Sequence, residues 1–188
     1  GGRRGLRRRY GGQGTAQAVD LGLEWLAKHQ TPEEGYWDCD GFQEQCKGNI
    51  CDGKGYPLYD PGCTGLALLA FLGAGYTHQA GKYKKNVANS IKYLKRIQDP
   101  EGCFGTQTGH FMYSHACCAL AMTEAYGMSN SPLLRRPVEK ALAFIYKAQN
   151  PNPSGTGKLA WRYTVQPGEN DTSVTGWMVM ALKSAKSA

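Results

Sequence analysis

Apolar residues recur along three segments of the chain with the same spacing. Val19, Leu23, Leu26 and Gln30 stand at offsets 0, 4, 7 and 11. Two further sets repeat these offsets: Val87, Ile91, Leu94 and Gln98, and then Val138, Leu142, Ile145 and Gln149. The first three positions of each set fall on one face of a helix. The pattern therefore predicts three amphipathic helices, each ending near a glutamine.

Each of these helices is followed by a similar turn. A proline stands two residues after each glutamine, and proline cannot continue a helix. A glycine and an aromatic residue come next: Gly35 with Trp37, Gly102 with Phe104, and Gly155 with Trp161. We expect structural roles for Gln30, Gln98 and Gln149, bonded to backbone groups at the turns, and for Trp37, Phe104 and Trp161, packed beside them.

A second class of helix is expected after each turn, at residues 61–74, 112–126 and 172–187. Aligning the three segments places Thr64, His115 and Thr175 together. The first two segments are apolar almost all round, which indicates burial on more than one side. Outer helices with one solvent-exposed face and buried inner helices imply two layers. The sequence thus predicts an all-α fold of the α/α toroid type, with three outer–inner helix pairs in a partial toroid or open crescent; the alternative is an unrelated helical bundle.

Charge divides the chain into two parts. Five of its 22 basic residues lie between Arg3 and Arg9, which leaves 17 basic against 15 acidic residues in the remainder. We interpret residues 1–14 as a basic, glycine-rich linker and residues 15–188 as the repeat domain. The basic arm could touch an anionic membrane surface, whereas the nearly neutral remainder gives no indication of nucleic-acid binding.

No stretch of the sequence is typical of a membrane span or a signal peptide. The longest continuous apolar run is Leu66–Leu72. We expect the chain to begin partway through a longer protein and the repeat domain to be incomplete at its C-terminus, with self-association as a way to complete it. The expected location is extracytoplasmic or membrane-tethered, through a segment outside this chain.

The repeats resemble a known superfamily. The segments GLEWLAKHQTPEEGYW, SIKYLKRIQDPEGCFG and TGLALLAFLGAG are similar to the QW-type signature of the terpenoid cyclases and prenyltransferases. The resemblance is in particular to the bacterial prenyltransferase/squalene oxidase repeat proteins, often envelope-associated and mostly without an assigned reaction. It implies an α/α toroid, closed in that superfamily by about six helix pairs, with a ligand in the central cavity.

The same resemblance implies a candidate catalytic element at the start of the third inner helix. Cyclases of the squalene–hopene type protonate an alkene with a D-x-D-D-T-A element. The corresponding residues here are 168–173, in which Asn170 replaces the central acid and Asp171 remains. Asp171 is either a catalytic remnant or a helix N-cap. His115 is either a general base at the mouth of a cavity or a satisfied core histidine.

Cysteines supply the remaining candidate chemistry. Cys39, Cys46 and Cys51 fall in one glycine-rich loop and Cys63 begins the next helix. Cys46 and Cys51 favour a small disulfide loop; the alternatives are a zinc site made with Cys39 and Cys63, or free thiols. The D-x-C zinc pair of the protein prenyltransferases is absent around Asp171. Zinc bound by the cysteines is the one cofactor considered, and no other cofactor is expected.

Aromatic side chains suggest where a ligand could bind. Phe111, Tyr113 and Trp177 could present π faces to an isoprenoid-like ligand, although packing is the simpler role for each. We therefore expect a non-catalytic repeat domain that binds an apolar small molecule or a protein partner. The alternative is an isoprenoid cyclase or prenyltransferase whose remaining catalytic residues lie outside this chain.

Overall fold

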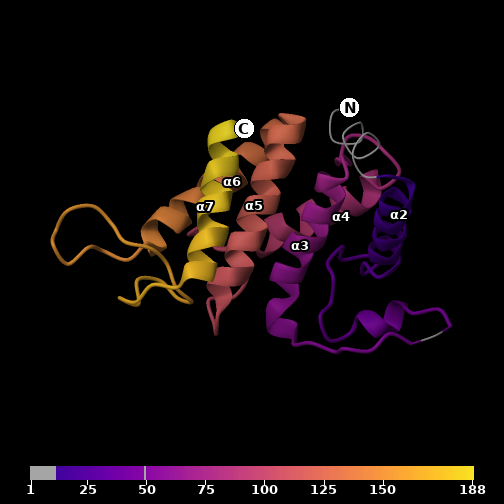
Figure 1. Cartoon of the computed structure of the whole chain (residues 1–188), viewed down its shortest axis with the longest axis horizontal. Coiled ribbons are helices and arrows are strands. Elements are labelled where there is room, and N and C mark those ends of the chain that lie inside the picture. Colours follow the sequence, from indigo (N-terminus) through magenta and orange to yellow (C-terminus); the bar gives the residue numbers. More distant parts are fainter. Residues whose placement is uncertain (1–11, 49) are drawn as a thin grey trace.

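The computed structural model describes residues 12–48 and 50–188. Within these ranges the chain forms helices and loops without a strand, which confirms the all-α fold; two isolated β-bridges join Gln98 to Phe104 and Pro151 to Lys158. The α-helices are α2 (Gly12–Lys28), α3 (Asp60–Gly73), α4 (Lys84–Ile97), α5 (Phe111–Ser129), α6 (Pro132–Ala148) and α7 (Thr172–Ser187) (Figure 1). Two short 3-10 helices, η1 (Phe42–Gln45) and η2 (Pro57–Tyr59), lie between α2 and α3.

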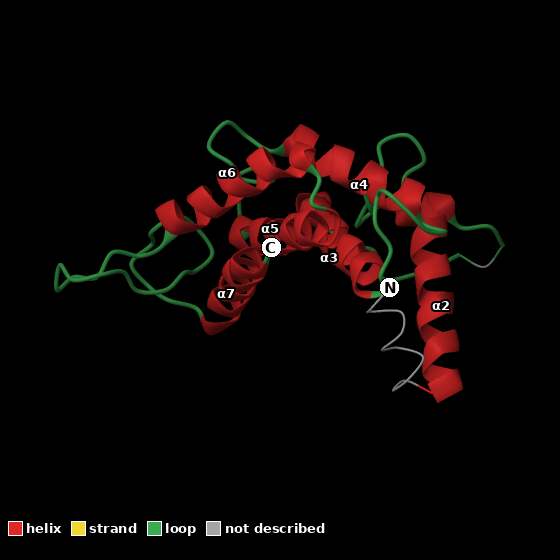
Figure 2. Cartoon of the chain, turned by 90° about the horizontal axis from the view of Figure 1, so that it is seen from above, coloured by secondary structure: helices red, strands yellow, loops and turns green. Residues whose placement is uncertain are grey.

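The helices form two layers along an arc. Figure 2 shows α2, α4 and α6 on the outside of the arc and α3, α5 and α7 on its inside. Helix α5 packs against α3 on one side and against α7 on the other. The described residues thus form three outer–inner pairs in an open crescent, an arrangement of the α/α toroid type.

The apolar stripes of the outer helices turn toward the core. Val87 and Leu94 of α4 and Ile145 of α6 have no exposed surface. Of the three stripe residues of α2, Leu23 is buried, while Val19 and Leu26 are half-buried. Helix α2 lies at one end of the arc and packs less extensively against α3 than α4 does. Its apolar stripe is therefore less completely covered than the stripe of α4.

The inner helices differ in burial. Helix α5 lies in the middle of the arc and buries most of its side chains, as expected. The expectation that α7 is also a buried inner helix is wrong: only Val174, Met178 and Ala181 are buried, and Val179 is 50% exposed. Helix α7 lies at the other end of the arc, where none of the described elements covers its far side.

The glutamines after the outer helices bond backbone carbonyls. Gln30 Nε2 donates to the carbonyl of Gly35 at 2.9 Å and to that of Asn86 at 3.0 Å. Gln98 Nε2 donates to Gly102 at 3.1 Å and to Pro137 at 2.9 Å. Each of these glutamines therefore ties its own turn to the following outer helix.

The third glutamine has a smaller role. Gln149 Nε2 donates to the carbonyl of Leu159 at 2.7 Å, within its own loop. No outer helix follows α6 among the described residues, so the second bond of the other two repeats has no counterpart here.

A turn glycine sets how closely successive outer helices approach. Gly102 has φ of +102°, a conformation that favours glycine, and a Cβ there would collide with the carbonyl oxygen of Lys140 in α6. Gly35 meets the backbone of Asn89 in α4 in the same way. Glycine is needed at both places because the turn backbone packs directly on the next helix.

The N-terminal segment is only partly described. Helix α2 begins at Gly12, so residues 12–14, expected as linker, are helical. The rest of the expected basic linker, and with it the proposed contact with an anionic membrane surface, lies outside the described residues. None of the helices in the described ranges combines the length and apolar character that crossing a bilayer requires.

Candidate functional site

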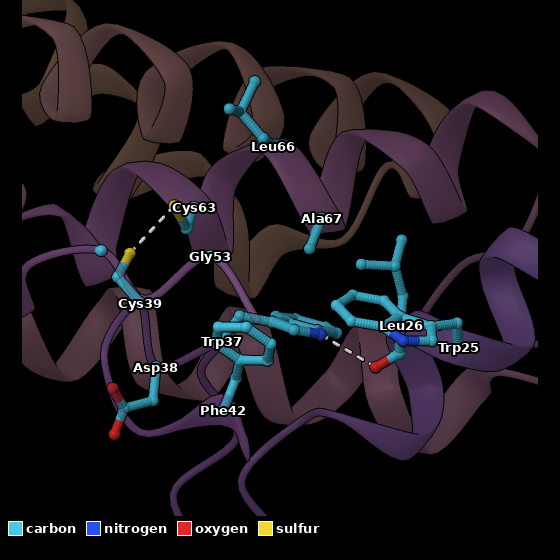
Figure 3. A pocket seen from close by; sticks show the side chains of 11 residues that line it. Trp25, Leu26, Trp37, Asp38, Cys39, Phe42, Gly53, Cys63, Leu66 and Ala67 are labelled. Atoms are coloured by element: carbon cyan, nitrogen blue, oxygen red, sulfur yellow. Dashed lines mark hydrogen bonds between the residues drawn. The ribbon is translucent and has the colours of Figure 1, made fainter. Parts of the chain in front are cut away.

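An apolar pocket lies between α2, the loop after it and α3. Its volume is about 460 Å³, within the range of pockets that bind small molecules. Trp25, Leu26, Trp37 and Phe42 form one side and Leu66 and Ala67 of α3 the other (Figure 3). The rest of the lining is Asp38, Cys39, Gly53, Gly55 and Cys63. The pocket offers aromatic and aliphatic surface with few polar groups.

Trp37 is fixed by α2 and α3. Its indole Nε1 donates to the carbonyl of Leu26 at 2.8 Å, and its backbone N–H donates to Thr64 Oγ1 at 3.0 Å. The ring is 5% exposed and packs against Phe71. These bonds hold the tryptophan as a rigid wall between α2 and α3.

The equivalent residues of the other repeats are held similarly. Trp161 Nε1 donates to the carbonyl of Ile145 at 2.8 Å, which repeats the bond of the first repeat. The backbone N–H of Phe104 donates to His115 Nδ1 at 3.2 Å, and that of Trp161 to Thr175 Oγ1 at 3.2 Å. The aligned positions 64, 115 and 175 thus accept the same hydrogen bond.

Four of the cysteines form two pairs that lie at different places. Cys39 Sγ and Cys63 Sγ lie 3.0 Å apart at the edge of the pocket (Figure 3). Cys46 and Cys51 instead lie around His29. All seven cysteines are free thiols in the structure, and a Cys46–Cys51 disulfide stays a prediction. The four thiols of this region do not converge on one site. The physical reason is that the loop folds back, which directs Cys39 to α3 and the other two thiols to the end of α2.

The Cys39–Cys63 pair changes the acidity of one thiol. The thiol of Cys39 donates to Cys63 and lowers the pKa of Cys63 to about 7, against the opposing effect of burial. The same bond, together with burial, raises the pKa of Cys39. Cys63 is therefore the more nucleophilic partner, and it lines the apolar pocket.

His115 lies away from this pocket. It has no exposed surface, stacks beside Phe104 and meets the edge of Phe144. Burial lowers its pKa to about 4, so the ring is neutral and accepts the Phe104 N–H at Nδ1. The structure places it in the packed core, where it serves as the counterpart of Thr64.

Asp171 stands at the N-terminus of α7. Its carboxylate accepts the backbone N–H of Val174 at 2.9 Å and the hydroxyl of Ser173 at 2.6 Å. Both bonds, with the hydroxyl first, lower the pKa of Asp171 below its usual value. It is thus an N-cap, and its carboxylate is held in the ionised form.

Asn170 is also engaged in hydrogen bonds. Its side-chain oxygen accepts from Asn150 Nδ2 and from the backbone N–H of Ala160, both at 3.0 Å. The residue that takes the place of the central acid therefore joins the long loop of the third repeat to the start of α7.

The three aromatics expected to bind a ligand do not line the pocket. Phe111 is buried against Phe144. Tyr113 stacks with Tyr163 and hydrogen-bonds Ser173, and Trp177 is half-buried at the edge of the core. Their contacts are with neighbouring helices and loops of the described chain.

Sequence reasoning missed the residues that matter most here. Trp25 lies on α2 and His29 directly follows the last residue of that helix. Their ring centroids are 4.0 Å apart, and the ring of Phe42 lies 6.1 Å from that of Trp25. The i, i+4 spacing of an aromatic and a histidine was the available signal. Nothing in the sequence indicates that the loop brings Phe42 back against this pair.

Comparisons with known proteins agree with the architecture. The profile of the squalene-hopene cyclase C-terminal domain family matches residues 7–188. The chain is 28% identical over 193 residues to a protein named squalene–hopene cyclase from Bradyrhizobium diazoefficiens. That alignment covers 96% of this chain but only 28% of the relative, so the chain spans well under half of the relative's length. No solved structure matches the chain significantly.

Proposed function

The chain belongs to the squalene-hopene cyclase C-terminal domain family, and from this we propose that it binds an apolar, isoprenoid-like ligand without catalysing a reaction by itself. The observation that carries the proposal is the pocket walled by Trp25, Trp37 and Phe42. Removing the surface of an isoprenoid chain from water supplies the driving force, at about 25 cal/mol per Å² of apolar area. Rigid aromatic walls reduce the cost of ordering the site.

The proposal that the chain catalyses no reaction by itself rests on two residues of the third repeat, Asn170 and Asp171. Protonation of an alkene requires a carboxylic acid kept in its protonated form. Asp171 is an N-cap with a lowered pKa, and Asn170 is an amide. These two residues therefore support a binding role rather than a cyclase reaction within this chain.

Binding can be tested with farnesol as a soluble isoprenoid probe. Leu66 lines the pocket and is 45% exposed, so Leu66→Glu places a charge in the pocket at little cost to the fold. We expect farnesol to bind the native chain and to bind this variant at least about tenfold more weakly, by isothermal titration calorimetry.

A matched control lies on another inner helix. Val179 of α7 is also apolar and half exposed but lies outside the pocket, so Val179→Glu should bind farnesol like the native chain. Equal affinity of the Leu66 variant and the native chain, or equal loss in both variants, would contradict binding in this pocket.

A second candidate is the alternative from the sequence, a cyclase or prenyltransferase with further catalytic residues outside this chain. Its support is the similarity to a relative named squalene–hopene cyclase, of which this chain spans 28%. Product formation from squalene by a longer protein that contains this chain, but not by the 188-residue chain alone, would favour this candidate over the binding role.

A further inference from the structure

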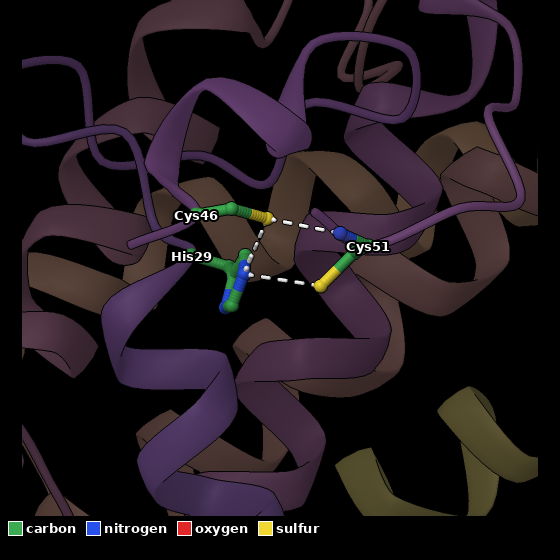
Figure 4. Close-up of side chains that lie close together, drawn as sticks. All are labelled: His29, Cys46 and Cys51. Carbon is green, nitrogen blue, oxygen red and sulfur yellow. Dashed lines mark hydrogen bonds between the residues drawn. The ribbon is translucent and has the colours of Figure 1, made fainter. Parts of the chain in front are cut away.

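Three side chains with metal-binding atoms converge beside the pocket, at the C-terminal end of α2. His29 Nε2 lies 3.5 Å from Cys46 Sγ and 3.6 Å from Cys51 Sγ (Figure 4). One ligand atom from each residue lies within 4.8 Å of the others. We propose that His29, Cys46 and Cys51 bind a zinc ion. This proposal does not rest on the proposed ligand-binding function.

The distances fit tetrahedral zinc. With Zn–S near 2.3 Å and Zn–N near 2.0–2.1 Å, the nitrogen and sulfur ligands of a tetrahedron are separated by about 3.6 Å. Both observed nitrogen–sulfur distances match this separation. The two sulfurs lie within 4.8 Å of each other, so all three ligand atoms can face one ion.

The histidine is oriented as a metal ligand. His29 Nδ1 lies 2.8 Å from the carbonyl oxygen of Trp25, which can only accept, so Nδ1 carries the proton. The lone pair is then on Nε2, the atom that faces the two sulfurs. A histidine fixed through its other nitrogen is the usual arrangement at zinc sites. Stacking on Trp25 and burial of the ring, which is 6% exposed, fix its orientation further.

The sulfur ligands are also suited to the charge of the ion. The backbone N–H of Cys51 donates to Cys46 Sγ at 3.3 Å, a bond that stabilises a thiolate. Two thiolates and a neutral imidazole would balance the charge of Zn²⁺, so a half-buried site carries no net charge. Thiolate and imidazole are the ligand types that favour zinc among common metals.

The ligand set differs from the four cysteines that the sequence suggested. Cys39 and Cys63 pair with each other and have no histidine beside them in the described chain. Three protein ligands leave the fourth tetrahedral position to water or an exogenous group, as in other Cys₂His zinc sites. The ion would also fasten the loop that carries Phe42, a wall of the pocket, to the end of α2.

The test is zinc stoichiometry of the 188-residue chain, purified with reduced thiols and measured by inductively coupled plasma mass spectrometry. We expect about one zinc per chain, and a cobalt-substituted sample should show the absorption of tetrahedral cobalt with sulfur-to-metal charge transfer. Cys46→Ser, Cys51→Ser and His29→Gln should each lower zinc affinity at least about tenfold. Circular dichroism of each variant verifies that the helices are retained.

Cys39→Ser and Cys63→Ser are the matched controls, since they remove the other thiol pair of the same region. Both should retain zinc and the cobalt spectrum. The proposal is overturned if the reduced, folded chain binds no zinc, or if the control variants lose it as fully as the ligand variants. A Cys46–Cys51 disulfide found by mass spectrometry in freshly purified, metal-free protein would also overturn it.

Discussion

Residues 64, 115 and 175 occupy the same position of the three repeats but differ in chemistry, because that position requires only a hydrogen-bond acceptor. Thr64 and Thr175 accept a backbone N–H through a hydroxyl, and His115 accepts one through Nδ1. The larger imidazole also fills core volume against Phe144. Neutral histidine is the form that can accept this bond, and complete burial enforces that form.

We expect His115 to make folding stability depend on pH. Its pKa is about 4 in the folded protein against about 6.5 when unfolded, so the unfolded chain binds the extra proton. The contribution is complete above about pH 6.5 and is lost as the pH falls toward 4, by about 2 kcal/mol between pH 7 and pH 5. Urea unfolding at the two pH values measures this loss.

His115→Thr provides the comparison, because threonine is the residue of the other two repeats. The variant should be less stable at pH 7, owing to the cavity it leaves, but should lose about 2 kcal/mol less than the native chain between pH 7 and pH 5. Parallel pH profiles for the two proteins would show that His115 titrates normally.

At the scale of elements, the turns connect one helix pair to the next. Gln98 bonds both its own turn and the start of α6, and Gly102 lets that turn reach the α6 backbone. Gln149 ends the series with a bond inside its own loop. The cost of losing a glutamine should therefore depend on whether another outer helix follows it.

Gln98→Ala should lower the free energy of unfolding by about 1–3 kcal/mol, because it removes the side-chain donor to two partly buried carbonyls, those of Gly102 and Pro137. Gln149→Ala should cost about 1 kcal/mol or less, since its single bond is exposed to water. Chemical denaturation of both variants measures the difference. A greater loss for Gln149→Ala would contradict a bridging role for Gln98.

Periodic elements were predictable from the sequence, and burial was predictable only where neighbours surround a helix. The offsets of Val87, Ile91 and Leu94 predicted the buried face of α4 because helical geometry alone determines that face. Helix α7 is less apolar than α3 and α5, and its exposure also depends on what lies beside it. Sequence periodicity carries no information about a missing neighbour.

At the scale of the whole molecule, the pocket and the proposed zinc site arise where a non-repeating loop meets the repeat. Phe42 and Cys51 reach α2 because the segment between Trp37 and Asp60 folds back across the first helix pair. The equivalent turn of the second repeat is short and leads directly from Phe104 toward α5. The candidate site could not be predicted because loop paths follow from tertiary contacts rather than from spacing.

The acids of the third repeat bear on catalysis by the chain as a whole. An aspartate introduced at position 170 would accept the same two N–H bonds, from Asn150 and Ala160, that the amide oxygen now accepts. Such bonds stabilise a carboxylate and lower its pKa. Asp171 beside it is held ionised by Ser173 and Val174. Restoring the acid therefore does not restore a proton donor.

We expect neither the native chain nor Asn170→Asp to convert squalene or transfer a prenyl group. Both proteins would be incubated with squalene and with prenyl diphosphates, and the extracts analysed by gas chromatography–mass spectrometry against a no-protein sample and an active cyclase. Because hydrogen bonds stabilise the ionised form of Asp171, and of an aspartate placed at position 170, the yield should equal that of the no-protein sample. Reproducible product that disappears in Asp171→Asn would instead show that this N-cap can act as the acid.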